Sequence, residues 1–204
     1  MKRNLFFSAS LLLIFFIFLT LITGMGSLGG MDLAVTKALQ LIIPRVFDLP
    51  FSLLSLFGSL ETVSIILFII LIIFRKLNYF YVLLNFALFH VIELFGKAFV
   101  THPGPGKEFF RYFFSFSFPS SSVKPGSSYP SGHLGRTMFI SIILVSLICN
   151  SKLTKLQKKL AIGIIIVIDL LMFISRIYLG EHWLSDVLGG SILGLSMGIF
   201  SLAL

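Results

Sequence analysis

The sequence predicts an all-α integral membrane protein in which six helices cross the bilayer. Hydrophobic residues make up 57% of its 204 residues, charged residues make up 12%, and the mean hydropathy is +1.04. Several apolar runs approach the roughly 20 residues that cross the hydrocarbon core as a helix. These values exclude a soluble globular protein, and the length predicts a single domain over 1–204.

Six apolar segments are expected to span the membrane. Their approximate bounds are 5–24, 55–74, 79–96, 133–150, 160–176 and 184–203. The first follows a basic start, MKRN, and is longer than the roughly 7–15 apolar residues of a signal peptide. No small-residue cleavage site follows it, so we expect a retained helix.

The connecting segments hold most helix-breaking residues. After the first span, Asp32 is expected to cap a short helix that Pro44 ends. The longest connection, 97–132, is rich in proline, glycine and serine and contains the aromatic block FFRYFFSFSF at 109–118. This block suits an interfacial aromatic belt or a guide for an acyl or prenyl chain. Cys149 is the only cysteine, which excludes an intrachain disulfide and a cysteine-based metal centre.

The distribution of basic residues predicts the orientation of the chain. With the N-terminus inside, the cytoplasmic parts hold no acidic residue and eight basic ones: Lys2, Arg3, Arg75, Lys76, Lys152, Lys155, Lys158 and Lys159. The opposite side also holds eight: Lys37, Arg45, Lys97, Lys107, Arg111, Lys124, Arg136 and Arg176. The first group lies in short segments, where the positive-inside rule counts most. We therefore expect both termini in the cytoplasm and the segments 97–132 and 176–184 on the outer face of the cell or inner membrane.

The stretch SRIYLGEHWLSD places His182 and Asp186 four residues apart. On a helix the two share a face, so the carboxylate can bond one ring nitrogen and leave the other as a base or nucleophile. Arg176 lies six residues before His182, across Gly180, which can turn the chain. Taken alone, the pair also fits an interfacial polar patch at a helix start.

The stretch YPSGHLGRT, 129–137, opens the predicted fourth span. Ser131 and Gly132 stand where backbone N–H groups at a helix start bind anions. A plain loop-to-helix junction accounts for these small residues. It does not account for His133 or Arg136, because ionisable groups at membrane depth are costly and usually functional.

The stretch KAFVTHPGPGK begins at Lys97 and carries His102 and Lys107 in a loop constrained by proline and glycine. Upstream, His90 and Glu93 fall on the same helical face as Lys97, which predicts a polar stripe facing the bundle. A lysine that reaches the headgroups would explain Lys97 equally well.

Together the three stretches supply two histidines, a carboxylate, several cations and a helix N-terminus on one side of the membrane. Cations and a helix start suit phosphate, and a His–Asp pair with a second histidine suits nucleophilic attack and leaving-group protonation. No carboxylate cluster for Mg²⁺ and no zinc-type spacing is present, which predicts metal-free phosphoryl transfer without a cofactor. Nothing resembles a nucleic-acid-binding module.

These stretches resemble the motifs of the type 2 phosphatidic acid phosphatase family, K-x6-R-P, P-S-G-H and S-R-x5-H-x3-D. The second is complete at 130–133 and the third at 175–186. The first is KAFVTHPGP at 97–105, with Gly104 where the family has arginine. The resemblance covers about 60–204.

The resemblance implies that His182 forms a phosphohistidine, that Asp186 orients it, and that His133 protonates the leaving group. Phosphate would be bound by Lys97, Arg176, Ser131 and Gly132. The implied substrate is a membrane lipid phosphate or pyrophosphate at the outer interface. Candidates are phosphatidate, phosphatidylglycerol phosphate, isoprenyl pyrophosphates and lipid A phosphates, which implies a role in phospholipid metabolism.

Three residues could replace the missing arginine: Arg136, His102 and Lys107. We expect Arg136, because it shares a helical face with His133 and long side chains lean toward the helix N-terminus. Pairing of Arg136 with Asp169 or Glu93, both within spans, fits the sequence equally well.

Two other functions fit the same motifs. A lipid phosphotransferase would pass the phosphoryl group to another lipid hydroxyl, and a non-catalytic binder or transporter would bind lipid phosphate without releasing phosphate. The lack of inverted repeats argues against transport. The related vanadium haloperoxidases do not fit an integral membrane chain, and the sequence carries no signal for an oligomeric state.

Overall fold

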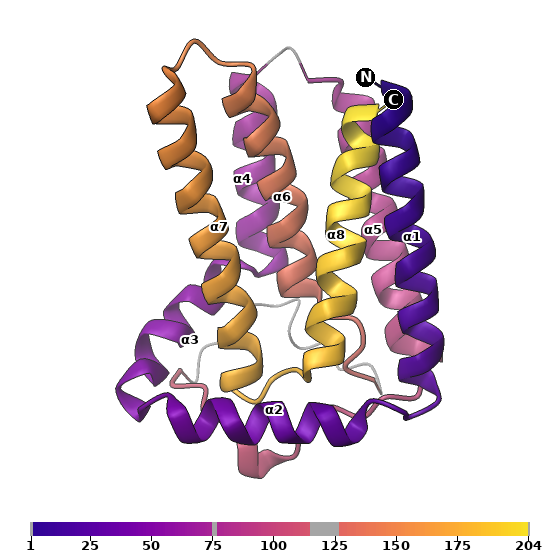
Figure 1. The fold of residues 1–204 in the computed structure, drawn as a ribbon, viewed down its shortest axis with the longest axis vertical. Helices are drawn as coiled ribbons and strands as arrows, with labels where there is room; N and C mark the ends of the chain where they lie inside the picture. The colour runs from indigo at the N-terminus through magenta and orange to yellow at the C-terminus, as the bar shows by residue number, and fades with distance from the viewer. Residues whose placement is uncertain (1, 75–76, 115–126, 204) are drawn as a thin grey trace.

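The computed structural model describes residues 2–74, 77–114 and 127–203, and all regular structure in these ranges is helical. The helices that run along the long axis of the molecule (Figure 1) are α1 (Lys2–Gly24), α4 (Leu60–Ile73), α5 (Tyr79–Phe99), α6 (Gly132–Cys149), α7 (Lys155–Tyr178) and α8 (Leu184–Ala203). Helix α2 (Gly29–Ile42) lies across one end of this bundle. The 3-10 turn η1 (Arg45–Phe47) leads from α2 to α3 (Asp48–Phe57), and a second turn, η2 (Lys107–Phe109), lies in the long connection.

Among the described residues, five helices are long and apolar enough to cross a membrane: α1, α5, α6, α7 and α8. Helix α2 and the η1–α3 segment pass the same test only as a pair bent by 99°, which raises the number to six if the pair is one span. The predicted all-α class is therefore confirmed, with five to six candidate spans.

The predicted second span, 55–74, is divided between α3 and α4 at Gly58. Ser59 has an extended backbone, and its side chain accepts a hydrogen bond from the Thr62 N–H, so it starts α4 as an N-cap. Helix α4 has 14 residues, fewer than a full crossing needs. One apolar run thus contains a break, which corrects the expectation of one helix over 55–74.

The predicted short helix after the first span is α2, which ends before Pro44. The expected role of Asp32 as its cap is wrong, because Leu28 is the N-cap and Asp32 lies buried inside the helix. The Asp32 carboxylate instead accepts hydrogen bonds from the Ser185 N–H and hydroxyl, each 2.8 Å. Asp32 therefore ties α2 to the start of α8.

Helix α8 is the central helix of the bundle and packs against α1, α5 and α6. A Cβ at Gly194 would lie 2.1 Å from the carbonyl oxygen of Gly135 in α6. A Cβ at Gly190 would lie 2.2 Å from the carbonyl oxygen of Ser131, just before α6. Small residues at such contacts let helices in membranes approach closely. The close fit holds the first turn of α8 against the start of α6.

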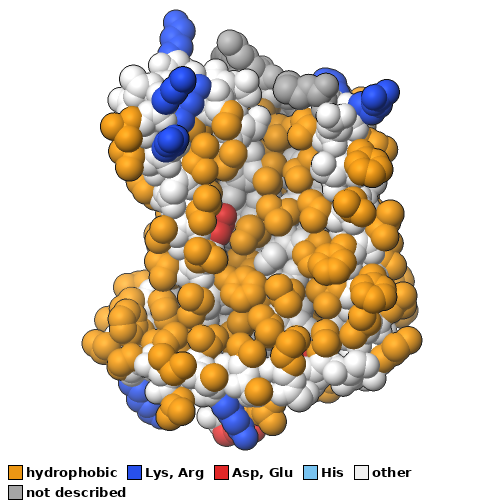
Figure 2. Space-filling view, in the orientation of Figure 1, with side chains coloured by type: hydrophobic (Ala, Val, Ile, Leu, Met, Phe, Trp, Pro, Cys, Tyr) orange, Lys and Arg blue, Asp and Glu red, His pale blue; other side chains and the backbone are white. Residues whose placement is uncertain are grey.

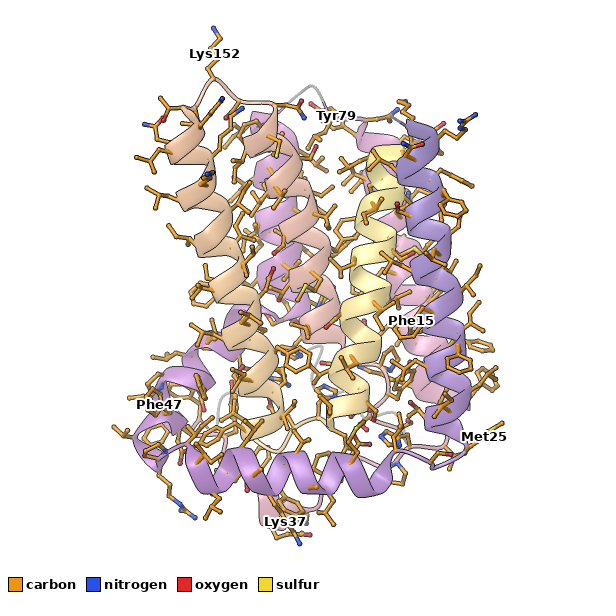
Figure 3. The ribbon with its side chains drawn as sticks, in the orientation of Figure 1. Phe15, Met25, Lys37, Phe47, Tyr79 and Lys152 are labelled. Carbon is orange, nitrogen blue, oxygen red and sulfur yellow. The ribbon has the colours of Figure 1, made fainter. Side chains whose placement is uncertain are left out.

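The surface is divided into an apolar middle and two charged ends. Hydrophobic side chains cover the broad middle of the face in Figure 2, and lysine and arginine side chains gather at its ends. Both termini lie at one end with Lys152, whereas Lys37 lies with α2 at the other end (Figures 1 and 3). This banding is typical of a protein that spans a bilayer.

Candidate active site

The three motif-bearing stretches meet at the end of the bundle that α2 covers. They come from the last turn of α5, the first turn of α6 and the connection between α7 and α8 (Figure 1). The Ser131 N–H donates a hydrogen bond of 2.9 Å to the Asp186 carbonyl oxygen. This backbone bond joins the start of α6 to the first turn of α8, so the second and third motifs are held together.

The connection between α7 and α8 positions His182. The chain turns at Gly180, which has a φ of +69°, and a Cβ there would lie 2.2 Å from the Phe109 carbonyl oxygen. The His182 N–H then donates to the Arg176 carbonyl oxygen at 3.2 Å. This backbone hydrogen bond holds His182 close to Arg176, as the sequence predicted.

His182 and Asp186 form the expected pair. His182 Nδ1 lies 3.3 Å from Asp186 Oδ2, and the Trp183 N–H donates to the same oxygen at 2.9 Å. Because a carboxylate accepts only, Nδ1 carries the proton and Nε2 keeps its lone pair. Burial lowers the pKa of His182, although the hydrogen bond and the charge of Asp186 oppose this effect. Burial thus favours the neutral ring, the form that a nucleophile requires.

His133 lies in the first turn of α6 and is partly buried. A Cβ at Gly58 would lie 3.1 Å from the His133 Cβ, so the break between α3 and α4 is packed against this ring. The side chains whose charges act on His133 are Arg176, Arg136, His182 and Lys97. The structure thus gathers both histidines and the predicted cations into one cluster.

Arg176 is buried at the end of α7, where its guanidinium Nη1 contacts Ser55 and Glu181. Neither partner was expected from the sequence. Ser55 belongs to α3, which has no motif residue, and Glu181 directly precedes the predicted nucleophile. Helix α3 therefore forms one wall of the site.

Glu93 is the centre of a second set of contacts. Its carboxylate lies 2.7 Å from Lys97 Nζ, 3.2 Å from Arg136 Nη1 and 3.1 Å from His90 Nδ1. Arg136 Nε also donates to the Gly58 carbonyl oxygen at 3.0 Å. The predicted polar stripe does face the bundle, and of the two pairings considered for Arg136 the structure contains the one with Glu93.

Asp169 has a different partner. Its carboxylate accepts a hydrogen bond of 2.8 Å from the hydroxyl of Ser141 on α6. The Asp169 side chain is buried between α6 and α7, as expected for an acidic residue within a span. It takes no part in the contacts of the histidines.

The start of α6 is open to an anion. Ser131 precedes the helix without capping it, and its buried hydroxyl has no hydrogen-bond partner in the part of the chain that the structure describes. A Cβ at Gly132 would lie 1.9 Å from Glu93 Oε1 and 2.7 Å from Arg136 Nη1, so a larger residue would displace these two side-chain ends. The free Ser131 hydroxyl and the start of α6 thus lie beside the paired Glu93 carboxylate and Arg136 guanidinium.

The other residues considered as replacements for the missing arginine lie elsewhere. His102 is buried, with its Nε2 3.0 Å from Ser185 Oγ and 3.4 Å from Asp186 Oδ1. Lys107 is exposed in η2, and Gly104 is exposed in the preceding loop. Lys124 and positions 115–118 of the aromatic block lie outside the described residues. Within the described part of the block, Phe109 packs edge-on against Trp183.

Comparison with known proteins places these motifs in a family. The model of the PAP2 superfamily matches residues 76–204 of this chain, which include all three stretches. The chain belongs to the PAP2 superfamily. Phosphatidylglycerophosphatase B of Bacillus subtilis (strain 168) is 41% identical over 69 residues, which make up 33% of this chain and 34% of that protein. The chain therefore matches about a third of the length of this curated relative.

Two solved structures resemble this PAP2 protein over most of its length. The first transmembrane PAP2 type phosphatidylglycerolphosphate phosphatase from Bacillus subtilis has a TM-score of 0.70 at 26% identity, covering 96% of this chain and 93% of that one. LpxE of Aquifex aeolicus has a TM-score of 0.63 at 26% identity, covering 84% of this chain and 94% of that one. The PAP2 protein described here is thus an integral membrane protein with the fold of transmembrane members of its family.

Proposed function

We propose that this PAP2 protein is a lipid phosphatase that hydrolyses the phosphate or pyrophosphate of a membrane lipid through a phosphohistidine. The observation that carries the proposal is the buried His182–Asp186 pair beside a second histidine and a cluster of cations. The similarity to a transmembrane phosphatidylglycerolphosphate phosphatase supports a phospholipid monoester as the substrate class.

The proposed reaction has two steps, in which His182 Nε2 first receives the phosphoryl group and then releases it. His182 Nε2 attacks phosphorus, the P–N bond forms, the bond to the leaving oxygen breaks, and His133 protonates that oxygen. A water molecule then gives its proton to His133 and attacks phosphorus, which breaks the P–N bond and releases phosphate. Asp186 holds the Nδ1 proton in both steps and stabilises the charged ring.

The cations act on the transferring phosphoryl group. Its transition state spreads negative charge over three equatorial oxygens, so positioned donors contribute most of the stabilisation. We assign this role to Lys97, Arg176 and Arg136, with the hydroxyl of Ser131 and the backbone of Gly132. Arg136 supplies the guanidinium that Gly104 cannot.

Without substrate, Glu93 pairs with both Lys97 and Arg136, and Arg136 lies beside Gly132. His102 is omitted from the phosphate-binding set, because its Nε2 is directed at Asp186 and Ser185.

We further propose that both termini face the cytoplasm and that the whole chain works as one domain with its site on the extracytoplasmic side. The bundle supports this arrangement, because the termini and the motif cluster lie at opposite ends (Figure 1). A site at the end of the bundle is also within reach of a lipid headgroup while the acyl chains stay in the bilayer.

The test is phosphate release from a panel of lipid phosphates and pyrophosphates in detergent micelles. The wild-type protein should release phosphate from at least one lipid, and His182→Ala should abolish turnover at an unchanged melting temperature. A His182→Ala variant that turns over at the wild-type rate would contradict the mechanism. A phosphorylated acceptor lipid in place of free phosphate would identify a phosphotransferase, and binding without either product would identify a lipid-phosphate binder.

Turnover should continue in excess chelator and should be inhibited by vanadate, which can adopt five-coordinate geometry. Among residues 2–74, 77–114 and 127–203, no three His, Cys, Asp or Glu side chains are arranged to hold a metal ion. Complete loss of activity in EDTA, restored by Mg²⁺, would count against the proposed chemistry.

A further inference from the structure

Asp186 has one oxygen that the proposed mechanism does not use. The carboxylate is fully buried, and Oδ2 accepts the bonds from His182 and Trp183. Oδ1 makes no regular hydrogen bond within the described chain, and Nε2 of His102 lies 3.4 Å from it. A buried carboxylate oxygen without a donor is costly, so the residue that faces it affects how the carboxylate is held.

The hydrogen-bond partners of Ser185 indicate which ring nitrogen of His102 carries a hydrogen. Asp32 accepts hydrogen bonds from both the N–H and the hydroxyl of Ser185, each 2.8 Å. Because the Ser185 hydroxyl hydrogen points to Asp32, its oxygen can only accept from His102 Nε2, which lies 3.0 Å away. His102 therefore carries a proton on Nε2, which it donates to Ser185 Oγ, and the same nitrogen lies 3.4 Å from Asp186 Oδ1 and 3.7 Å from Asp32 Oδ2.

These contacts form one chain of polar groups from α2 to the nucleophile. It runs from Asp32 to Ser185, His102, Asp186 and His182, and all five side chains are buried. Asp32 and Ser185 are far apart in the sequence, 153 positions, so the chain exists only in the folded protein. Within the described part of the chain, no hydrogen bond or ion pair joins the four members other than His182 to the proposed phosphate-binding cations.

We propose that His102 is a positioning residue for the histidine nucleophile, held by Asp32 and Ser185 against the free oxygen of Asp186. The inference rests on the proposed function, because it concerns the same nucleophile. The His102 N–H sets the plane of the Asp186 carboxylate, and the carboxylate in turn aims Nε2 of His182 at phosphorus. A small misplacement of a reacting group lowers the rate of chemistry more than it weakens substrate binding.

His102→Ala should lower kcat by roughly 10–10²-fold with KM nearly unchanged, the range typical for loss of a residue that orients a reactive group. His102→Gln should recover most of this loss, because its amide NH₂ can donate to the same two oxygens. An equal loss in both variants, or a loss confined to KM, would overturn the proposal.

The coupling to Asp186 can be measured in a double-mutant cycle of His102→Ala and Asp186→Asn. If His102 acts through Asp186, its removal should change kcat by less than about threefold in the Asp186→Asn background. Additive losses would show that His102 acts independently of the nucleophile pair.

The chain offers a matched control for the serine in this network. Ser185 and Ser141 each donate a hydroxyl hydrogen bond of 2.8 Å to a buried aspartate, but Ser141 bonds Asp169 between α6 and α7. Ser185→Ala and Ser141→Ala should both lower the melting temperature, and only Ser185→Ala should lower kcat. Equal kcat in the two variants would refute the role of the network in catalysis.

A measurement without substrate separates failure of this inference from failure of the proposed function. In ¹⁵N-histidine spectra of the detergent-solubilised protein, His102→Ala should shift the ring nitrogens of His182, whereas Ser141→Ala should leave them in place. If the wild-type protein releases no phosphate from any lipid, the proposed function fails and the spectra still decide the inference. Unshifted His182 resonances in His102→Ala would overturn it.

Discussion

The two histidines of the site have different surroundings. His182 is paired with a buried carboxylate, which fixes its tautomer. His133 lies in a field of cations, and no carboxylate lies within ion-pair distance of it among the described residues. We propose that a bound phosphate offsets these positive charges, so that the ring can hold the proton that the first step requires.

His133→Ala should therefore slow turnover by roughly 10²–10⁴-fold, the usual contribution of general acid catalysis. Phosphorylated enzyme should accumulate, because water is activated by the same residue in the second step. Acid-labile phosphoprotein after a short incubation with lipid substrate is the measurement. The loss should be smaller for pyrophosphate lipids, whose leaving group needs less protonation, and an equal loss for both classes would argue against the acid role.

Arg136 has two functions to separate, since it bonds Glu93 and is proposed to bind phosphate. Arg136→Lys keeps the positive charge for Glu93 but loses the planar fork, so kcat/KM should fall roughly 10²-fold with little change in stability. Arg136→Ala leaves a buried carboxylate with one fewer partner and should also destabilise the fold, by about 3–5 kcal/mol. The measurements are kcat/KM and melting temperature on the same samples. Activity that follows stability in both variants would make Arg136 structural and direct the search to Lys107.

At the level of elements, the site depends on how closely α8 approaches the start of α6. A Cβ at Gly190 would overlap the Ser131 carbonyl oxygen, and backbone cannot move aside as a flexible side chain can. Gly163 in α7 has nothing within 4 Å of an added Cβ. Alanine substitution at Gly163 is therefore a matched control for alanine substitution at Gly190.

Gly190→Ala should destabilise the protein by about 1–3 kcal/mol, the usual cost of overpacking, and should lower activity by displacing Ser131 from Asp186. Gly163→Ala should be stabilising by about 0.5–1 kcal/mol, because alanine is the better helix former, and should leave activity unchanged. Thermal unfolding and phosphate release are measured for both. A Gly190→Ala variant as stable and active as the wild type would show that the α6–α8 contact does not set the site.

For the whole molecule, the orientation in the membrane can be tested by labelling the native cysteine, Cys149. Cys149 is exposed and ends α6, at the end of the bundle that carries the termini (Figure 1). Lys37 is exposed on α2 at the other end (Figure 3).

In sealed right-side-out vesicles, a membrane-impermeant maleimide should leave Cys149 unlabelled until the membrane is permeabilised. In a Cys149→Ser background, Lys37→Cys should be labelled without permeabilisation. The reverse pattern would place the site on the cytoplasmic side and overturn the proposed topology.

The sequence by itself determined the helical class, most of the helix bounds and the motif residues of the site. These depend on local information: apolar runs long enough to cross a bilayer, helix-breaking residues between them, and His182 and Asp186 one helical turn apart. The division of the run 55–74 was missed because its apolar composition is continuous, and only the capping bond of Ser59 and the packing of Gly58 on His133 end the helix.

The tertiary structure decided which groups surround the motif residues. Arg176 contacts Ser55 across 121 positions, and Asp32 bonds Ser185 across 153. Arg136 had two possible partners, Asp169 and Glu93, and only the packing of α5 beside α6 selected Glu93. Such pairings depend on how helices pack, because each buried polar group must find a partner wherever the bundle brings one within reach. The spacing of residues along the chain does not show which side chains on different helices will meet.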